Sequence, residues 1–474
     1  MKKALVLAVV AALMSAPPAP RANRTTAGSV SGSRPNVVLI LTDDQRFDAL
    51  GHMPILRSQL VRKGLSFERY YVVNPLCCPS RATTLTGEYS HTTGVYFNSG
   101  SQGGWRAFRI HELLTIATTL HLGGYRTALI GKYLNGYDHA GHVPAGWDRW
   151  VAMLKVGYYG VPFSVDGHEV VTGSHRYSTD VLADYASDFI RSVPSRQPLF
   201  LYLTPFAPHL PAIPASRDEH ALAKLKPFRP PSYNEADISD KPAYVRRHAE
   251  MSKSKRDHTD MIRRDQLRSL LAVDDLIGRV VDALKDQGRL ENTLIMFASD
   301  NGFLWGEHRL PDGKNRPYEE SVRVPLVARW DGHIAAGTVD DDHVVGNLDL
   351  APTWADLAGV PLLGADGVSM APLLTGAGAG AGTSWRKYLL IEHGENGVPA
   401  FCQIHSVRYS YVLYSTGEEE LYDLQLDPYE LQNRAGEAAY RSIRDEYRTQ
   451  EERMCEPKPP GWNPEASLPI LLGR

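Results

Sequence analysis

Four apolar segments of the sequence are each followed by polar side chains of kinds that can do chemistry. Short runs rich in Val, Ile and Leu predict buried strands of a parallel sheet. The runs are residues 36–41 before Asp43-Asp44, 125–130 before Gly131-Lys132, 199–203 before Ala207-Pro208-His209, and 293–298 before Asp300-Asn301. Ligands of an open parallel sheet bind at the carboxyl ends of its strands. We therefore expect these polar side chains to meet at one edge of the sheet.

Asp43, Asp44, Asp300 and Asn301 offer only oxygen atoms as ligands. Such a set suits a hard cation, Ca²⁺ or Mg²⁺, better than zinc. A helix cap or a turn would explain any one of these residues by itself. Four of them at matching strand ends instead predict a shared metal site.

Residues 76–87 (LCCPSRATTLTG) contain two adjacent cysteines and the spacing C-x-P-S-R, which begins at Cys77 and ends at Arg81. Adjacent cysteines are poorly placed to bridge each other, and this favours a chemical role for one of them. A helix that starts near the proline and buries a cysteine is the alternative explanation. The polar residues expected at the sheet edge favour the chemical role.

This spacing resembles the signature of the sulfatase family, in which the first cysteine of C-x-P-S-R is oxidised to formylglycine. Cys77 fits that register, whereas Cys78 does not. Further segments that resemble the family follow in its order and cover nearly the whole chain. They are Asp43-Asp44, Gly131-Lys132-Tyr133, Ala207-Pro208-His209, Ser299-Asp300-Asn301-Gly302, Lys314, and Glu420-Leu421-Tyr422-Asp423 with Asp427-Pro428. Residues 131–135 (GKYLN) and 143–150 (VPAGWDRW) are most similar to the N-acetylglucosamine-6-sulfatase and heparan 6-O-endosulfatase branch.

The resemblance implies a sulfuric-ester hydrolase of the alkaline phosphatase-like superfamily. A formylglycine-generating enzyme would modify Cys77 during export, and the hydrated aldehyde would form a covalent sulfate ester before it releases sulfate. One Ca²⁺ ion, or alternatively Mg²⁺, would be bound. Its implied ligands are Asp43, Asp44, Cys77, Asp300 and Asn301.

The resemblance also implies four further catalytic residues. Arg81 would hold the hydrated aldehyde, while Lys132 and Lys314 would face the sulfuryl oxygens. His209 would donate a proton or a hydrogen bond to the leaving oxygen, because the ordinary pKa of histidine lies near neutrality.

One position departs from the pattern of many arylsulfatases, which carry Lys-x-His after the second strand. Here Leu134 takes the place of that histidine and Asn135 follows it, as in the N-acetylglucosamine-6-sulfatase branch. A second group that handles protons is therefore not assigned. Asn135 and His308 are candidate substrate-binding residues, with a structural role in a loop as the alternative for His308.

The N-terminus predicts export. Two lysines precede an apolar run over residues 4–16, and this pattern is typical of a secretory signal peptide within residues 1–22. The run is too short to span a bilayer, so we expect a secreted protein with no integral membrane segment after signal removal. In an oxidising compartment, Cys402 and Cys455 could form a disulfide.

The remaining pattern predicts an α/β fold with a large, mainly parallel sheet flanked by helices, followed by a smaller C-terminal α+β subdomain. Helical spacing occurs at residues 58–63, 109–122, 180–192, 266–287 and 435–454, and strand-like runs occur late in the chain at 388–391 and 409–414. The expected organisation is a signal peptide at 1–22, a leader at 23–34, a catalytic domain at 35–375, a Gly/Ala linker at 376–383 and a C-terminal subdomain at 384–474.

Composition restricts the function less than the motifs do. The 474 residues carry a net charge of −3, which does not favour nucleic-acid binding. The expected substrate is a carbohydrate sulfate such as 6-sulfated N-acetylglucosamine. An arylsulfatase, a phosphonate or phosphate ester hydrolase of the same superfamily, and a secreted protein that only binds sulfated glycans are the alternatives. Basic residues between 246 and 268 could bind a polyanion, although a solvated helix face with interleaved aspartates is the simpler explanation.

Overall fold

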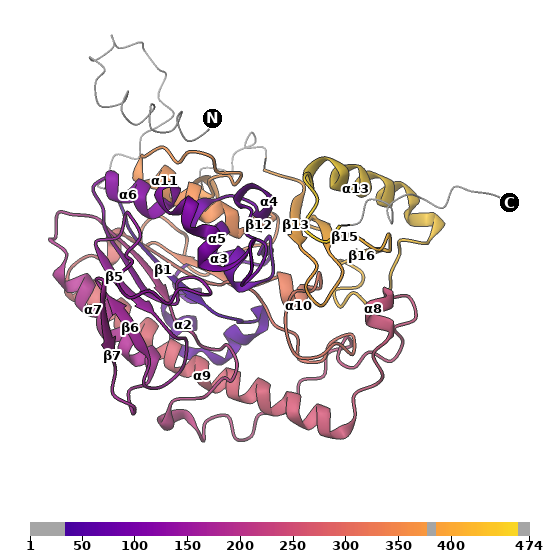
Figure 1. The fold of residues 1–474 in the computed structure, drawn as a ribbon, viewed down its shortest axis with the longest axis horizontal. Helices are drawn as coiled ribbons and strands as arrows, with labels where there is room; N and C mark the ends of the chain where they lie inside the picture. The colour runs from indigo at the N-terminus through magenta and orange to yellow at the C-terminus, as the bar shows by residue number, and fades with distance from the viewer. Residues whose placement is uncertain (1–33, 377–384, 463–474) are drawn as a thin grey trace, which may run out of the picture. The chain divides into compact units, whose positions relative to one another are not determined.

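The computed structural model describes residues 34–376 and 385–462, and a ten-stranded mixed sheet lies at its centre (Figure 1). The strand order is β11-β2-β10-β9-β1-β8-β4-β5-β6-β7. The bounds are β1 Asn36–Thr42, β2 Leu65–Phe67, β4 Arg126–Gly131, β5 Arg149–Met153, β6 Pro162–Val165, β7 His168–Val171, β8 Leu199–Thr204, β9 Thr293–Ser299, β10 Leu326–Arg329 and β11 Thr338–Asp340. The central strands from β9 to β5 are parallel and antiparallel pairs flank them. The predicted mainly parallel sheet is confirmed.

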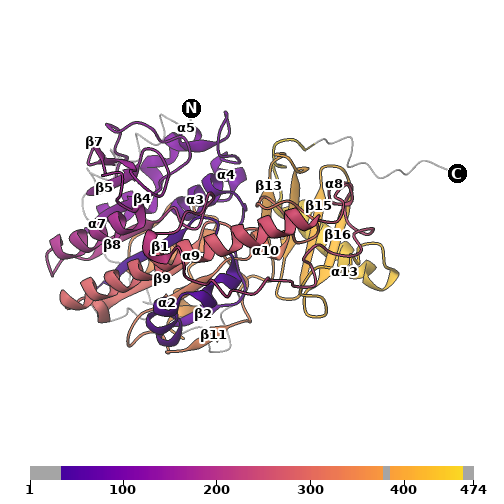
Figure 2. The ribbon, with the colours of Figure 1, turned by 90° about the horizontal axis from the view of Figure 1, so that it is seen from below.

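Helices cover both faces of this sheet, because alternate residues of each central strand point to opposite faces. In β1, Val37 and Leu39 belong to one apolar core, whereas Val38 and Ile40 belong to the other. The first core includes α3 Cys77–Thr86, α5 Gly104–Phe108, α6 Ile116–Leu122 and α11 Leu350–Ala358, and the second includes α2 Pro54–Gln59, α7 Ser178–Ser192 and α9 Lys253–Asp286 (Figures 1 and 2).

Shorter elements connect these layers. They are η1 Phe47–His52, η2 Val61–Lys63, β3 Tyr70–Tyr71, α4 Ser90–Thr93, η3 Arg109–Leu114, η4 Ser216–Asp218, α8 Ala243–Arg246, η5 Leu290–Asn292, α10 Glu319–Val322, β12 Val345–Gly346, η6 Asn347–Asp349 and α12 Ala371–Leu374. β3 and β12 form a separate parallel pair. In the part of the chain that the structure describes, no helix has the length and apolar character needed to cross a membrane.

Several predicted helices have different bounds in the structure. The helix predicted at 58–63 is divided at Leu60 between the end of α2 and η2, and the one predicted at 435–454 is helical only from Ala438. The predicted helix at 266–287 is the second part of α9, which starts at Lys253, where the Ser252 hydroxyl accepts a hydrogen bond from the Lys255 amide at 3.3 Å. The predicted helix at 109–122 is interrupted at Thr115, whose extended backbone separates η3 from α6.

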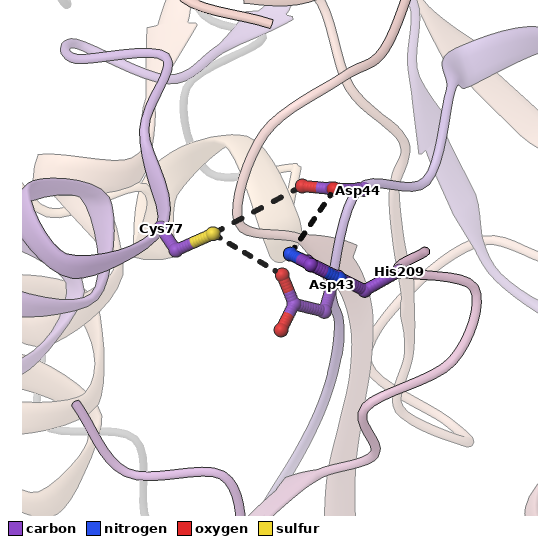
Figure 3. A group of neighbouring side chains, drawn as sticks. All are labelled: Asp43, Asp44, Cys77 and His209. Carbon is purple, nitrogen blue, oxygen red and sulfur yellow. Dashed lines mark hydrogen bonds and ion pairs between the residues drawn. The ribbon is translucent and has the colours of Figure 1, made fainter. Parts of the chain in front are cut away.

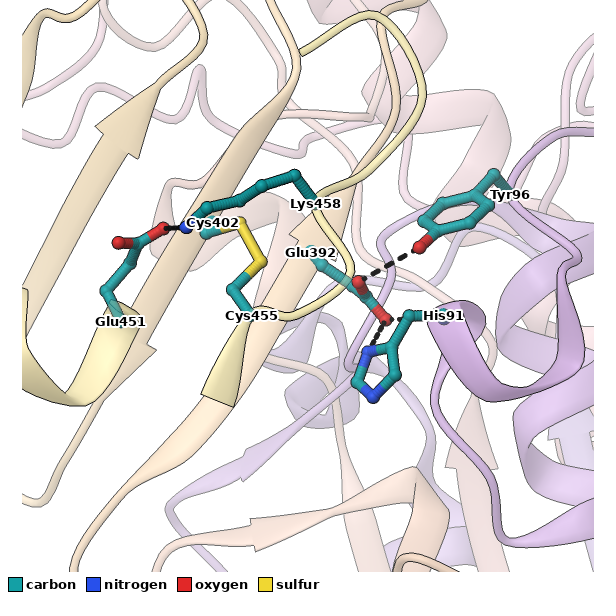
Figure 4. Close-up of a disulfide and its surroundings, with 7 residues drawn as sticks. All are labelled: His91, Tyr96, Glu392, Cys402, Glu451, Cys455 and Lys458. Atoms are coloured by element: carbon teal, nitrogen blue, oxygen red, sulfur yellow. Dashed lines mark hydrogen bonds and ion pairs between the residues drawn. A yellow bond between two sulfur atoms is a disulfide. The ribbon is translucent and has the colours of Figure 1, made fainter. Parts of the chain in front are cut away.

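A four-stranded antiparallel sheet forms the predicted C-terminal subdomain. Its strands are β13 Leu389–His393, β14 Phe401–His405, β15 Tyr409–Tyr414 and β16 Glu419–Asp423, and its helix is α13 Arg441–Met454, after η7 Ala438–Tyr440. A disulfide between Cys402 and Cys455 joins β14 to the end of α13 (Figure 4). The predicted signal peptide and nearly all of the predicted leader and linker lie outside the described residues.

One contact between the C-terminal sheet and the larger domain lies close to the residues of interest. Glu392 of β13 is fully buried and accepts hydrogen bonds from the amide and the ring Nδ1 of His91, both at 2.9 Å (Figure 4). The Glu392 amide in turn donates to the carbonyl of Val73, four residues before Cys77. The C-terminal subdomain therefore supports the segment that leads into α3.

Candidate active site

The ends of β1 and β9 place four acidic and amide side chains in contact. Asp43 and Asp44 follow β1, and Asp300 and Asn301 follow its parallel neighbour β9. The Asp44 amide donates to Asp300 Oδ1 at 3.2 Å, and Asn301 Nδ2 donates to Asp44 Oδ1 at 2.7 Å. All four side chains are buried. The structure thus brings together the residues expected at the sheet edge.

Cys77 is the first residue of α3 and points at this group. α3 is buried along its whole length and ends at Gly87, whose φ of +77° suits a residue without a side chain. The Cys77 Sγ lies 3.3 Å from Asp43 Oδ1 and 4.0 Å from Asp44 Oδ1 (Figure 3). Burial and the neighbouring Asp43 raise the pKa of the Cys77 thiol to about 12, so the unmodified thiol is neutral at physiological pH.

Three cations surround the carboxylates. The Arg81 guanidinium, one turn after Cys77 on α3, donates to Asp300 Oδ2 at 2.7 Å. Lys132, at the end of β4, forms an ion pair with Asp43. Lys314 forms an ion pair with Asp44, and its Nζ lies 2.8 Å from the Cys77 Sγ.

These cations keep the buried Asp43 carboxylate ionised. Although burial opposes the shift, the charges of Lys132, His209 and Arg81 hold the pKa of Asp43 well below its usual range. The local charge of the three aspartates is balanced by Arg81 and the two lysines.

The donor set fits a hard divalent cation. Asp43, Asp44, Cys77 and His209 each offer a ligand atom, and these atoms all lie within 4.8 Å of one another (Figure 3). The Oδ1 of Asn301 is buried and has no hydrogen-bond partner among the described residues. This is expected of an oxygen that binds a cation. Asp43, Asp44 and Asn301 offer oxygen atoms, which Ca²⁺ and Mg²⁺ prefer.

The remaining candidate residues lie in different environments. The His209 side chain is 29% exposed, and its Nε2 lies 3.6 Å from Asp44 Oδ2. The Asn135 Oδ1 is buried without a partner among the described residues. His308 is fully buried, and its Nδ1 lies 2.6 Å from Glu235. The structure therefore brings His209 to the Cys77 group but gives His308 a buried partner instead of a contact there.

Sequence reasoning missed an ion pair that braces the site. Arg46, two residues after Asp44, donates to Glu307 Oε1 at 2.7 Å and to the Phe303 carbonyl at 2.9 Å. This pair joins the loop after β1 to the loop after β9, which carry the acidic side chains. The position of Arg46 close to Asp44 suggested a role at the site. Its partner lies 261 residues away, and no pattern in the sequence predicted that contact.

A parallel sheet with acidic strand ends, and a buried helix start facing them, defines a protein of the alkaline phosphatase-like class. Residues 35–360 match the Sulfatase family, and residues 306–456 match the family described as N-sulphoglucosamine sulphohydrolase, C-terminal. The chain belongs to the sulfatase family.

Relatives and a solved structure agree with this assignment. The chain is 36% identical to the N-acetylglucosamine-6-sulfatase of Homo sapiens over 391 residues, or 78% of this chain and 69% of that protein. It is 35% identical to the extracellular sulfatase SULF-1 homolog of Drosophila melanogaster over 371 residues, or 76% of this chain. A structure described as a complex with its substrate D-glucosamine-2-N,6-O-disulfate matches with a TM-score of 0.76 at 26% identity, covering 89% of this chain and 98% of that one. The alignment with the Drosophila melanogaster relative spans only 33% of that protein's length.

Proposed function

We propose that this protein hydrolyses a sulfate ester of a carbohydrate, with 6-sulfated N-acetylglucosamine as the first substrate to test. The observation that carries the proposal is the position of Cys77, at the start of a buried helix and within 3.3 Å of Asp43 and 2.8 Å of Lys314. The names of the human relative and of the glucosamine disulfate complex support a 6-sulfated glucosamine.

Conversion of Cys77 to formylglycine by a formylglycine-generating enzyme would supply the nucleophile that the neutral thiol lacks. A Ca²⁺ ion, with Mg²⁺ as the alternative, would be held by Asp43, Asp44, Asp300 and Asn301 together with the modified Cys77. When bound, this ion polarises the sulfuryl oxygens.

The cationic side chains would act on the charge of the sulfuryl group. Lys314 is 14% exposed, so its amine can meet both Cys77 and a ligand that enters from solvent. Lys132 and Arg81 are buried and form ion pairs with Asp43 and Asp300, respectively. We assign the binding of sulfuryl oxygens to the two lysines, and the orientation of residue 77 to Arg81.

His209 is our candidate for the group that gives a proton to the leaving sugar oxygen. Its side chain is partly exposed beside Asp44, and histidine can exchange a proton near neutral pH. Asn135, whose Oδ1 has no hydrogen-bond partner among the described residues, is our candidate for contact with a sugar hydroxyl. Secretion through a cleaved signal peptide would place this chemistry outside the cytoplasm, where sulfated glycans are available as substrates.

The test is sulfate release by protein produced together with a formylglycine-generating enzyme. Three substrates are compared, 6-sulfated N-acetylglucosamine, an aryl sulfate and the matching aryl phosphate, and the Cys77→Ala variant is the control. Sulfate release from the sugar that the variant lacks supports the proposal. Preference for the aryl sulfate would indicate an arylsulfatase, and release of phosphate alone would indicate a phosphoesterase. Tight glycan binding without release, although Cys77 is converted, would indicate a binding protein.

A further inference from the structure

Three side chains outside the Cys77 group converge in the interior and leave polar atoms without partners. His308, Glu320 and Glu430 each offer a ligand atom, and these atoms all lie within 4.8 Å of one another. The Nε2 of His308, the Oε2 of Glu320 and the Oε1 of Glu430 are buried and have no hydrogen-bond partner among the described residues. Unsatisfied polar atoms are rare in protein interiors, so three in one cluster indicate a ligand.

The ring of His308 is held in the way that metal-binding histidines are held. Its Nδ1 lies 2.6 Å from Glu235 Oε2, and its ring stacks on the ring of Tyr318 with 4.1 Å between the centroids. Metal-binding histidines commonly bond a carboxylate through one ring nitrogen, which fixes the ring and leaves the other nitrogen for the metal. His308 is fully buried, and its Nε2 lies 4.0 Å from Glu320 Oε2.

Glu320 and Glu430 are also held by hydrogen bonds, but they lack a counter-charge. The Ser232 hydroxyl donates to Glu320 Oε1 at 3.0 Å, and the Glu319 amide donates to Glu430 Oε2 at 2.9 Å. Neither carboxyl has a lysine or arginine nitrogen within 4.0 Å in the part of the chain that the structure describes. A buried carboxyl without a cation either takes up a proton or coordinates a metal. A proton on Glu320 cannot bridge the 4.0 Å to His308 Nε2, because hydrogen bonds are about 3 Å long, so protonation does not satisfy the histidine.

A cavity of about 130 Å³ reaches this cluster. Glu319 and Glu320 line it from α10, and Pro428 and Tyr429 line it from the segment that leads to Glu430. Tyr429 is 41% exposed, so the cavity opens toward solvent. The volume admits an ion together with water molecules.

The donor set of this cluster suits a divalent transition metal. One imidazole nitrogen and two carboxylates are ligands of the kind that Zn²⁺ binds, whereas Ca²⁺ takes oxygen ligands. Zinc is usually tetrahedral, and bonds of about 2.1 Å then separate the ligand atoms by about 3.4 Å. The Nε2 of His308 and the Oε2 of Glu320, 4.0 Å apart, need to approach by only about half an ångström. Water from the cavity completes the coordination.

We propose that His308, Glu320 and Glu430 bind a divalent transition metal ion, with Zn²⁺ as the ion to test first. This ion is separate from the cation expected at Cys77 and takes no part in sulfate release. It joins the loop after β9, α10 and the segment after β16, and α10 lies between the large sheet and the C-terminal sheet in Figure 1. His308 is in the same loop as Lys314, whose amine lies 2.8 Å from the Cys77 Sγ, so the ion also stabilises the loop that carries this lysine.

The first experiment measures the metal content of protein that carries no polyhistidine tag, by mass spectrometry of the elements after equilibration with Ca²⁺ and Zn²⁺ and gel filtration. We expect about one Zn²⁺ per chain in the wild type. Glu430→Gln and His308→Gln should weaken zinc binding by at least about tenfold, since the loss of even an outer partner has that effect. Glu452→Gln, which removes an exposed carboxylate of α13, and Cys77→Ala should both keep the zinc.

The second experiment follows thermal unfolding of protein from which a chelator has stripped transition metals, with Ca²⁺ present throughout. Added Zn²⁺ should raise the melting temperature of the wild type and of Cys77→Ala, but not that of Glu430→Gln. Neither experiment requires sulfate release, so the site can fail while the sulfatase function stands, and the reverse. A wild type that retains no transition metal and does not respond to Zn²⁺ would overturn the site, even where a ligand variant fails to fold. Equal zinc retention in the wild type and in Glu430→Gln would overturn it as well, whereas another transition metal whose retention depends on Glu430 would support it.

Discussion

The Nζ of Lys314 lies 2.8 Å from the Sγ of Cys77, although 237 residues separate the two in sequence. The same amine is paired with Asp44, so its position is fixed from the acidic side of the site as well. A fixed charge beside the reacting atom needs little reorganisation during the reaction. This contact makes Lys314 the side chain whose removal should act most directly on the chemical step.

Lys314→Ala should lower kcat by about a hundredfold or more, because removing one preorganised donor to a developing oxyanion has that effect in other enzymes. Lys253→Ala, which removes an exposed lysine of α9, should leave kcat unchanged. Both are measured by steady-state sulfate release, with circular dichroism to verify folding. A lysine at 314 that only balances the charge of Asp44 would change the melting temperature and leave kcat nearly intact.

Cys77→Ala should affect turnover, whereas Cys78→Ala should affect mainly stability. Cys77 faces the acidic group, whereas Cys78 belongs to the apolar core beneath α3. We expect Cys77→Ala to abolish turnover and retain the fold. Cys78→Ala should keep formylglycine at position 77 and lose about 1 kcal/mol of unfolding free energy, typical of a small core truncation. Mass spectrometry of the peptide, turnover and urea unfolding measure the three quantities, and equal loss of turnover in both variants would contradict the assigned register.

Metal removal should lower both activity and thermal stability. A ligand that binds only the folded state raises stability by an amount that grows with its concentration, so chelation should lower the melting temperature. Added Ca²⁺ should restore it at lower concentration than Mg²⁺ does. Asn301→Ala removes an oxygen that has no other described partner and should reduce the shift caused by Ca²⁺. A melting temperature that does not respond to Ca²⁺ in wild-type protein would refute the cation site.

The parts of the fold that the sequence predicts well are those with a strong local signal. The run at 36–41 is β1, Asn36–Thr42, and the run at 293–298 is β9, Thr293–Ser299, because buried central strands are apolar on both faces. The antiparallel strands β6 and β7 at the sheet edge were not predicted. β7 is exposed throughout, so no apolar pattern marks it.

The candidate site likewise contains some residues that the sequence predicts and others that it does not. Strand ends and the C-x-P-S-R spacing were enough to expect Asp43, Cys77 and Asp300 at one place. The burial of His308 against Glu235 could not be predicted, because it depends on a loop 73 residues earlier in the chain.

The buried pair of Glu235 and His308 should make stability depend on pH. Burial raises the pKa of Glu235 from 4.5 to about 8 and lowers the pKa of His308 to about 3, so the pair is neutral in the folded protein at neutral pH. The unfolded chain loses the Glu235 proton near pH 4.5 and the folded chain keeps it up to about pH 8, so the folded state binds more protons in this window. The contribution of Glu235 to the unfolding free energy therefore falls as pH rises through the window, by at most about 1.4 kcal/mol per pH unit. The contribution of His308, whose pKa is lowered from 6.5, has the opposite sign below that pH and is common to wild type and a Glu235 variant.

Glu235→Gln keeps a neutral side chain at this position and should remove that slope. Urea unfolding of protein stripped of transition metals, at several pH values between about pH 5 and pH 8, measures it as the difference between wild type and variant. Glu219→Gln, at an exposed position, is the control and should follow the wild-type slope. Other buried acids titrate equally in all three proteins, so the difference isolates residue 235. Parallel curves for wild type and Glu235→Gln would mean that Glu235 is already ionised beside Lys241, whose amine lies 3.8 Å away.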